Sequence, residues 1–300
     1  MRGSCFAEIL IHGNMRISSK LHSRPIILKA ILGQINFLLN KFTYDSDELI
    51  VLNYHSTPKK FIDNFEKQTL FFKKHFDIIN PECLTDYYNG KLTSKKPKLL
   101  LTFDDGLKNN LYAAEVLYKH GIKAIFFLIP DFVDSDVTSQ KGYYLKHIRP
   151  IINPNIDFES EDFEAIGWAD LSELVSQGHC MGSHSKSHTM VADKLTESQL
   201  TEEIVESGLT IEKKLGIKVN SFCSINNTLL SIGAREKLLI NQHYEFHFTT
   251  IPGSNMIQKS KQFIKRRNVE CFWPDGAMLF AVGKQDLRRW QSKIKQYEVL

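Results

Sequence analysis

The sequence predicts an α/β protein built from repeated strand–helix units. Short apolar runs at residues 49–52, 99–103 and 124–129 are typical of buried parallel strands. Segments with apolar residues at helical spacing separate these runs. Such βαβ units close with a right-handed connection, and they build either a closed or nearly closed barrel or an open doubly wound sheet. In both architectures a functional site is expected at the carboxyl ends of the strands.

Composition fits a globular protein with a sizeable core. The chain has 300 residues, of which 42% are hydrophobic and 24% are charged. Its net charge of +4 is slight, and no basic face alternates with stacking aromatics, so we expect no nucleic-acid partner. The five cysteines form no Cys-x-x-Cys pair, which predicts neither a zinc ribbon nor a disulfide framework and fits a reducing compartment.

Residues 1–43 are interpreted as an N-terminal extension. They lack the apolar core and small-residue site of a signal peptide, which favours a cytoplasmic location. Residues 25–42 carry apolar side chains at helical spacing, interrupted by Lys29 and Asn36, so this helix is too polar to span a bilayer. We expect it to pack on the domain. The alternative is an amphipathic helix in peripheral contact with a membrane surface.

The remaining elements follow the chain in order. Strands are expected at residues 49–55, 77–80, 99–103, 124–129, 219–223, 245–250, 263–272 and 277–282, and helices at 107–120, 170–178, 196–216, 228–240 and from 285 onwards. Residues 131–166 break this rhythm with a polar segment that contains Arg149. A segment of this length is either a lid or binding loop, or a surface excursion.

Two adjacent carboxylates, Asp104 and Asp105, follow the apolar strand at residues 99–103. Neighbouring carboxylates repel, so such a pair is expected to hold a cation or a proton. Gly106 then allows a tight turn of the backbone. The alternative is that Asp-Asp-Gly is an ordinary turn sequence.

Two histidines, His184 and His188, lie four residues apart after another predicted strand. This spacing is common in metal sites, either on one helical turn or on a loop. With one carboxylate it would bind Zn²⁺, Fe²⁺, Mn²⁺ or Co²⁺, because the ligand types do not choose among these metals. A surface or helix-capping role for the pair is the alternative.

These motifs resemble those of a known family. Thr102-Phe-Asp-Asp-Gly106 and His184-Ser-Lys-Ser-His188 are similar to the first two motifs of the polysaccharide deacetylases, carbohydrate esterase family four. The resemblance covers about residues 48–283. It implies a distorted (β/α) barrel with seven strands, in a single catalytic domain over residues 44–300 that follows the helical extension.

The resemblance also implies a chemistry and its residues. Asp105, His184 and His188 would bind one divalent metal ion. Zinc is the expected metal, and cobalt, manganese and nickel are the alternatives. Asp104 would be the general base. The expected reaction is hydrolysis of an N-acetyl group on an acetylated sugar, whose source is an N-acetylated glycan or a glycan precursor.

The chain departs from the family pattern in two places. Residues 221–227 lack the proline of the third motif, and residues 276–281 lack the histidine of the last motif, so the general acid is unassigned. His55 and His247 are candidates for the acid. Arg266 or Arg267 matches an arginine beside the base, and His55 and Arg267 are candidate substrate-binding residues. A catalytically silent glycan-binding relative is therefore the alternative function.

Overall fold

A computed structural model describes residues 20–39, 44–150, 159, 162–189, 195–225, 233–257 and 259–283 of the chain. Its strands are β1 (Glu48–Tyr54), β2 (Asp77–Ile78), β3 (Lys98–Phe103), β4 (Ile125–Leu128), β5 (Cys180–Ser183), β6 (Ser221–Cys223), β7 (Phe246–Phe248), β8 (Asn255–Met256) and β9 (Arg267–Asn268). Its helices are α1 (Lys20–Leu38), α2 (Ile62–His75), α3 (Leu84–Tyr88), α4 (Asn110–Lys119), α5 (Pro130–Val133), α6 (Val137–Tyr143), α7 (Trp168–Ser176), α8 (Glu197–Thr201), α9 (Ser207–Leu215), α10 (Ala234–His243) and α11 (Asp275–Val282).

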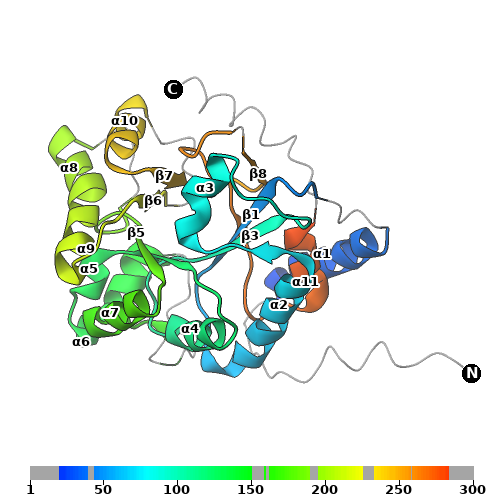
Figure 1. The fold of residues 1–300 in the computed structure, drawn as a ribbon. Helices are drawn as coiled ribbons and strands as arrows, with labels where there is room; N and C mark the ends of the chain where they lie inside the picture. The colour runs from blue at the N-terminus through cyan, green and yellow to red at the C-terminus, as the bar shows by residue number, and fades with distance from the viewer. Residues whose placement is uncertain are drawn as a thin grey trace, which may run out of the picture.

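The main sheet has seven strands in the order β7-β6-β5-β4-β3-β1-β8, with helices around it (Figure 1). The strands from β7 to β1 run parallel, and β8 pairs antiparallel with β1. β9 pairs parallel with β1 on the edge that β8 also occupies, further along the strand at Leu52 and Asn53. Ile264, three residues before β9, bridges to Phe248 of β7. The segment that contains Ile264 and β9 therefore connects β7, at one edge of the sheet, with β1 near the opposite edge, so that the sheet curls toward closure. This is the predicted distorted (β/α) barrel.

The buried side chains form two hydrophobic cores, one on each face of the sheet, because side chains alternate along the strands. Leu49 and Val51 of β1, with Leu100 of β3, belong to an inner cluster with Phe127 and Phe248. Their neighbours in sequence point the other way and pack under the helices. Successive side chains of a strand point to opposite faces of the sheet. A strand that is buried on both faces therefore has an uninterrupted run of apolar residues in the sequence. The same alternation places Thr102 and Asp104 on the inner face of β3.

The N-terminal helix α1 packs closely on α11, the last described helix. A Cβ built on Gly33 would lie 1.8 Å from the carbonyl oxygen of Gly276, and one built on Gly276 would lie 2.4 Å from that of Ala30. Only glycine at both positions permits this approach. The expected packing of the extension helix on the domain is confirmed. None of the helices in the described ranges combines the length and apolar character that a membrane crossing requires.

The strand predicted at residues 277–282 is wrong. These residues form α11, a helix that begins after Pro274 and is almost entirely buried. A short, continuous apolar run is compatible with a buried strand and with a buried helix, and only packing against α1 decides between them. Of the strand-like segment predicted at 263–272, only β9 is regular. The predicted helix from residue 285 lies outside the described residues.

Candidate active site

A cavity of about 380 Å³ opens at the carboxyl ends of the parallel strands. Asp104 and Asp105 enter it after β3, and His184 enters it after β5. The long connection before α7 contributes Arg149, and α1 contributes Lys29. The site predicted from separate motifs therefore lies in one hollow, at the edge where strands of this fold class place their functional loops.

Three of the predicted ligand atoms converge in this cavity. The Nε2 atoms of His184 and His188 each lie 3.6 Å from Oδ1 of Asp105, and all three side chains are buried. The opposite ring atoms face backbone carbonyls: Nδ1 of His184 lies 2.9 Å from the oxygen of Cys223, and Nδ1 of His188 lies 2.8 Å from that of His147. With the proton on Nδ1, both Nε2 lone pairs point at Asp105, as in metal-ligating histidines.

The donor set fits a divalent metal. Two imidazole nitrogens and one carboxylate suit Zn²⁺ and its neighbours in the first transition row. Burial lowers the pKa of His184 to about 4, which keeps this ring neutral and able to ligate. Oδ2 of Asp105 is buried without a hydrogen-bond partner, and a metal would satisfy this carboxylate.

Unusual backbone conformations orient these ligands. Asp105, Ser185 and His188 have φ values of 72°, 63° and 61°, a region that side chains other than glycine seldom occupy. The loop that carries both histidines is tied to a neighbouring helical turn, because the Glu203 carboxylate accepts hydrogen bonds from the backbone N–H and the hydroxyl of Ser187. Strain of this kind persists only where the surroundings hold it. The histidine pair therefore lies on a loop rather than on a helix.

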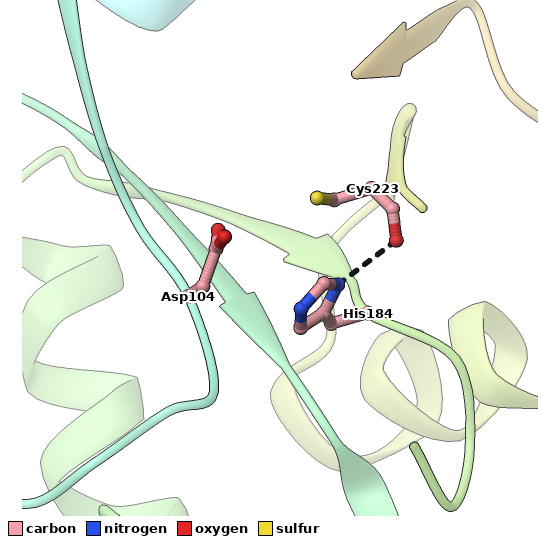
Figure 2. Close-up of side chains that lie close together, drawn as sticks. All are labelled: Asp104, His184 and Cys223. Carbon is pink, nitrogen blue, oxygen red and sulfur yellow. Dashed lines mark hydrogen bonds between the residues drawn. The ribbon is translucent and has the colours of Figure 1, made fainter. Parts of the chain in front are cut away.

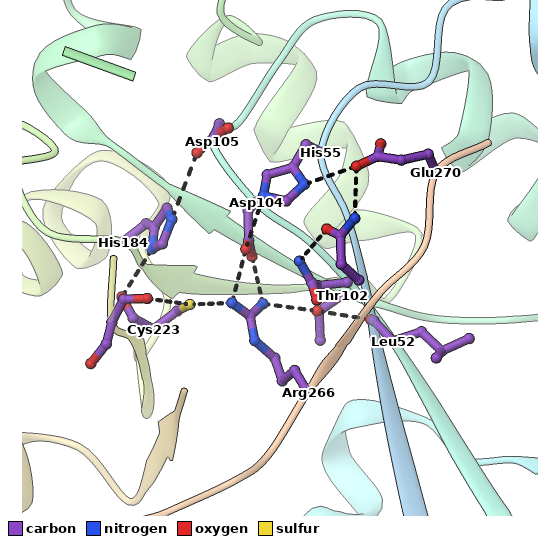
Figure 3. A network of polar contacts seen from close by, with 12 residues as sticks. Leu52, His55, Thr102, Asp104, Asp105, His184, Cys223, Arg266 and Glu270 are labelled. Carbon is purple, nitrogen blue, oxygen red and sulfur yellow. Dashed lines mark hydrogen bonds and ion pairs between the residues drawn. The ribbon is translucent and has the colours of Figure 1, made fainter. Parts of the chain in front are cut away.

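Asp104 is held by an arginine inside the barrel (Figure 3). Nη1 of Arg266 lies 2.6 Å from Oδ1 of Asp104, and Nη2 lies 2.8 Å from Oδ2. Burial by itself raises the pKa of the carboxyl, but the Arg266 guanidinium, assisted by His184 and His55, outweighs it and holds the pKa below its usual range. Asp104 is thus a carboxylate beside the three ligands and not one of them.

A second cluster of potential ligand atoms consists of Asp104, His184 and Cys223 (Figure 2). It is the weaker candidate for a metal. Both oxygens of Asp104 are already paired with Arg266, and Nη2 of Arg266 also lies 2.8 Å from the Cys223 sulfur. Burial raises the pKa of the Cys223 thiol well above its usual value, which opposes the thiolate that a metal needs.

The candidates for the general acid lie in different places. Nε2 of His55 lies 3.8 Å from Oδ2 of Asp104, and its Nδ1 lies 3.8 Å from Oε1 of Glu270 (Figure 3). His55 lines the cavity and is partly exposed. His247 is fully buried, its Nε2 lies 2.6 Å from the Ser224 hydroxyl, and it does not line the cavity. Only His55 is placed to reach a substrate.

The two arginines of the predicted pair have different surroundings. Arg266 contacts Asp104, whereas Arg267 lines the cavity with a guanidinium that donates to the carbonyls of Gly253, Ala281 and Gly283. The arginine beside Asp104 is therefore Arg266. The contacts of Arg267 tie β9 to the end of α11.

Sequence reasoning missed two residues of the site. Arg149 reaches the cavity, with Nη2 at 3.5 Å from Oδ2 of Asp105, and Glu270 faces His55. Arg149 belongs to the long connection at residues 131–166, where the cluster of Tyr143, Tyr144, His147 and Arg149 was the available signal. Nothing local in the sequence distinguishes Glu270.

Comparison with known proteins agrees with the fold. Residues 91–227 match the family model described as polysaccharide deacetylase. This match indicates a hydrolase that acts on non-peptide carbon–nitrogen bonds. The matched segment includes Asp104, Asp105, His184 and His188. No functionally curated protein matches the chain.

Several solved structures share this fold. A polysaccharide deacetylase from Bacillus cereus superposes with a TM-score of 0.57 at 22% identity, over 78% of this chain and 68% of that chain. The deacetylase PplD from Streptococcus pyogenes, in complex with acetate, gives 0.58 at 15% identity over 79% and 99%. IcaB from Ammonifex degensii gives 0.56 at 20% identity over 79% and 98%. At these identities the likeness shows a common fold.

Proposed function

We propose that this domain is a metal-dependent N-deacetylase that removes acetyl groups from an acetylated sugar of a poly- or oligosaccharide. The observation that carries the proposal is the convergence of Asp105, His184 and His188, with both histidines tethered through Nδ1. A divalent ion held there, zinc in the first place, would polarise the acetyl carbonyl and lower the pKa of a bound water.

The side chains around this centre supply the proton transfers. Asp104 is ionised and adjoins the three ligands, so it accepts the proton of the attacking water. Departure of the amine requires a proton donor, and His55 lines the same cavity 3.8 Å from Asp104. His55 is therefore assigned as the general acid, with Glu270 as the positioning residue behind it. Arg266 keeps Asp104 oriented and ionised.

Metal analysis and acetate release test this proposal together. We expect about one divalent ion per purified wild-type chain and its loss in Asp105→Ala, His184→Ala and His188→Ala, because each variant removes one ligand. Asp104→Asn should retain the metal and lose acetate release from N-acetylated oligosaccharides. Wild-type metal content in the three ligand variants would show that the site is assigned incorrectly.

The alternative is a glycan-binding relative without turnover, which is suggested by the absence of a histidine from residues 276–281. That stretch is part of the buried helix α11. His55, which follows β1 and lines the cavity, is available as a proton donor instead. Retained metal and measurable glycan binding, without acetate release from a panel of acetylated sugars, would favour the alternative.

A further inference from the structure

Helix α1 has an apolar face that the described residues leave uncovered. Its large apolar side chains there are between 39% and 77% exposed: Ile27, Leu28, Ile31, Leu32, Ile35, Leu38 and the adjoining Leu39. At 100° per residue they fall on one arc of the helix, and Ala30 and Gly33 lie on the opposite arc against α11. The exposed face is therefore continuous and points away from the barrel.

Apolar surface of this kind needs an occupant. Among the described side chains of α1, from Ile26 onwards, only Gly33 is buried, where the helix meets α11, and the apolar arc on the opposite side is exposed. In the described part of the chain, eight of the thirteen exposed large hydrophobic side chains lie between Ile27 and Leu39. Contiguous exposed apolar patches mark contacts with proteins or membranes.

Charge favours a membrane among these occupants. Residues 1–43 contain six Lys and Arg residues and one Glu, a net charge of +5, whereas residues 44–300 carry a net charge of −1. The positive charge of the protein is thus concentrated in the segment that holds the apolar face. A sequence segment that combines an apolar helical face with an excess of basic residues is suited to an anionic lipid surface.

The packing of α1 connects this face to the cavity. Backbone contacts at Gly33 and Gly276 fix α1 on α11 (Figure 1), so the helix cannot turn without moving the domain. Lys29 of α1 lines the cavity, and its Nζ lies 4.6 Å from the centre of the Trp273 ring. Phe280 of α11 lines the same cavity. A surface that covers the outer face of α1 therefore lies next to the cavity.

We propose that α1 is an interfacial helix that inserts its outer face into an anionic lipid surface and holds the cavity beside that surface. The orientation of the domain follows from the fixed α1–α11 contact. The identity of the substrate rests on the proposed deacetylase function: under that function, the substrate is an acetylated glycan located at a membrane surface.

Vesicle sedimentation of the full chain tests this proposal. The variant Leu28→Glu/Ile31→Glu/Ile35→Glu changes three side chains of the outer face, which are 57%, 53% and 46% exposed. The matched control Leu70→Glu/Leu209→Glu/Leu238→Glu changes side chains that are 49%, 48% and 58% exposed elsewhere. The probes are vesicles of phosphatidylcholine with about one third phosphatidylglycerol, and vesicles of phosphatidylcholine alone.

Wild type and control should sediment with the anionic vesicles and bind the neutral vesicles more weakly. The outer-face variant should bind the anionic vesicles at least about tenfold more weakly, because three charges oppose insertion. Equal binding by all three proteins, or no binding by wild type, overturns the proposal. A wild-type dimer that dissociates only in the outer-face variant, with no vesicle binding, shows that a second copy covers the face.

Acetate release from a soluble N-acetylated oligosaccharide separates this proposal from the proposed function. Neither set of substitutions touches the cavity residues, so both variants should release acetate at the wild-type rate. Vesicle binding without any acetate release would overturn the deacetylase function and leave the interfacial helix standing.

Discussion

Arg266 and Asp104 form a two-point ion pair inside the barrel, with nitrogen–oxygen distances of 2.6 and 2.8 Å. The side chain of Arg266 is also held by the carbonyl of Thr249, the hydroxyl of Thr102 and the sulfur of Cys223. Asp104, the proposed general base, is thus supported by a segment that follows it by more than 160 residues. This relationship determines how the base is oriented, and it can be tested.

Removing the arginine should leave a buried carboxylate without its partner. We expect Arg266→Met to lower the free energy of unfolding by about 3–5 kcal/mol, because an uncompensated buried charge remains. Urea unfolding measures this loss. Arg266→Lys keeps the charge and loses the two-point geometry, so it should be less destabilised but still impaired in acetate release. Equal stability of Arg266→Met and wild type would contradict the role of the pair.

Glu203 should control metal affinity without binding the metal. Its carboxylate accepts hydrogen bonds from the backbone N–H and hydroxyl of Ser187, next to the ligand His188. Glu203→Ala should weaken metal binding by about 10- to 100-fold, the usual cost of losing support around a ligand. Competition with a chelator measures it. Glu206→Ala is the matched control, because Glu206 is exposed on the same helical turn, and it should bind metal like wild type.

His55 should matter most for substrates with poor leaving groups. An amine must be protonated to depart, whereas a phenolate departs without protonation. His55→Gln should therefore lower kcat for an N-acetylated sugar by about 10²–10⁴-fold and barely affect hydrolysis of an aryl acetate. Asp104→Asn is the control that slows both substrates. A loss of both activities in His55→Gln would assign His55 another role.

Glu270→Gln should slow acetate release from an N-acetylated sugar, because it removes the carboxylate 3.8 Å from Nδ1 of His55. A positioning role predicts that kcat falls while KM stays close to the wild-type value. If only thermal stability changed, Glu270 would have a structural role alone.

His179 should make the fold sensitive to acid. Its Nδ1 accepts a hydrogen bond from the backbone N–H of Ala124, and burial lowers the pKa of the ring to about 4. The folded state thus holds the neutral ring, while the unfolded chain takes up a proton below about pH 6.5. The stabilising contribution is complete above that pH and decreases as the pH falls toward 4.

The contribution of His179 to the free energy of unfolding should be about 2 kcal/mol smaller at pH 5 than at pH 7.5. Urea unfolding of wild type and His179→Gln at both pH values isolates it, because the remaining titratable groups are shared. The stability difference between the two proteins should shrink by that amount at pH 5. A difference independent of pH would contradict the assignment.

Features that depend on residues close together in the sequence could be predicted, and features that depend on distant residues could not. The strand–helix repeats, the Asp104-Asp105 and His184-His188 motifs and their position after strands were predictable, because each depends on neighbouring residues. The helix at α11 was predicted as a strand, since the six apolar residues 277–282 fit either element until α1 packs against them. Glu270 could not be found in advance, because its partner His55 is 215 residues away in the chain.

The α/β class, the barrel expected from the family resemblance and the residues that gather at the carboxyl ends of the strands can be predicted from the amino-acid sequence. These features follow from local periodicity and from short motifs whose spacing is fixed along the chain. The folded chain is needed to show that Arg266 and not Arg267 holds Asp104, that Arg149 enters the cavity, and that α1 has one apolar face directed outward. Such contacts join distant segments, and they arise only when the barrel closes and its two cores are filled.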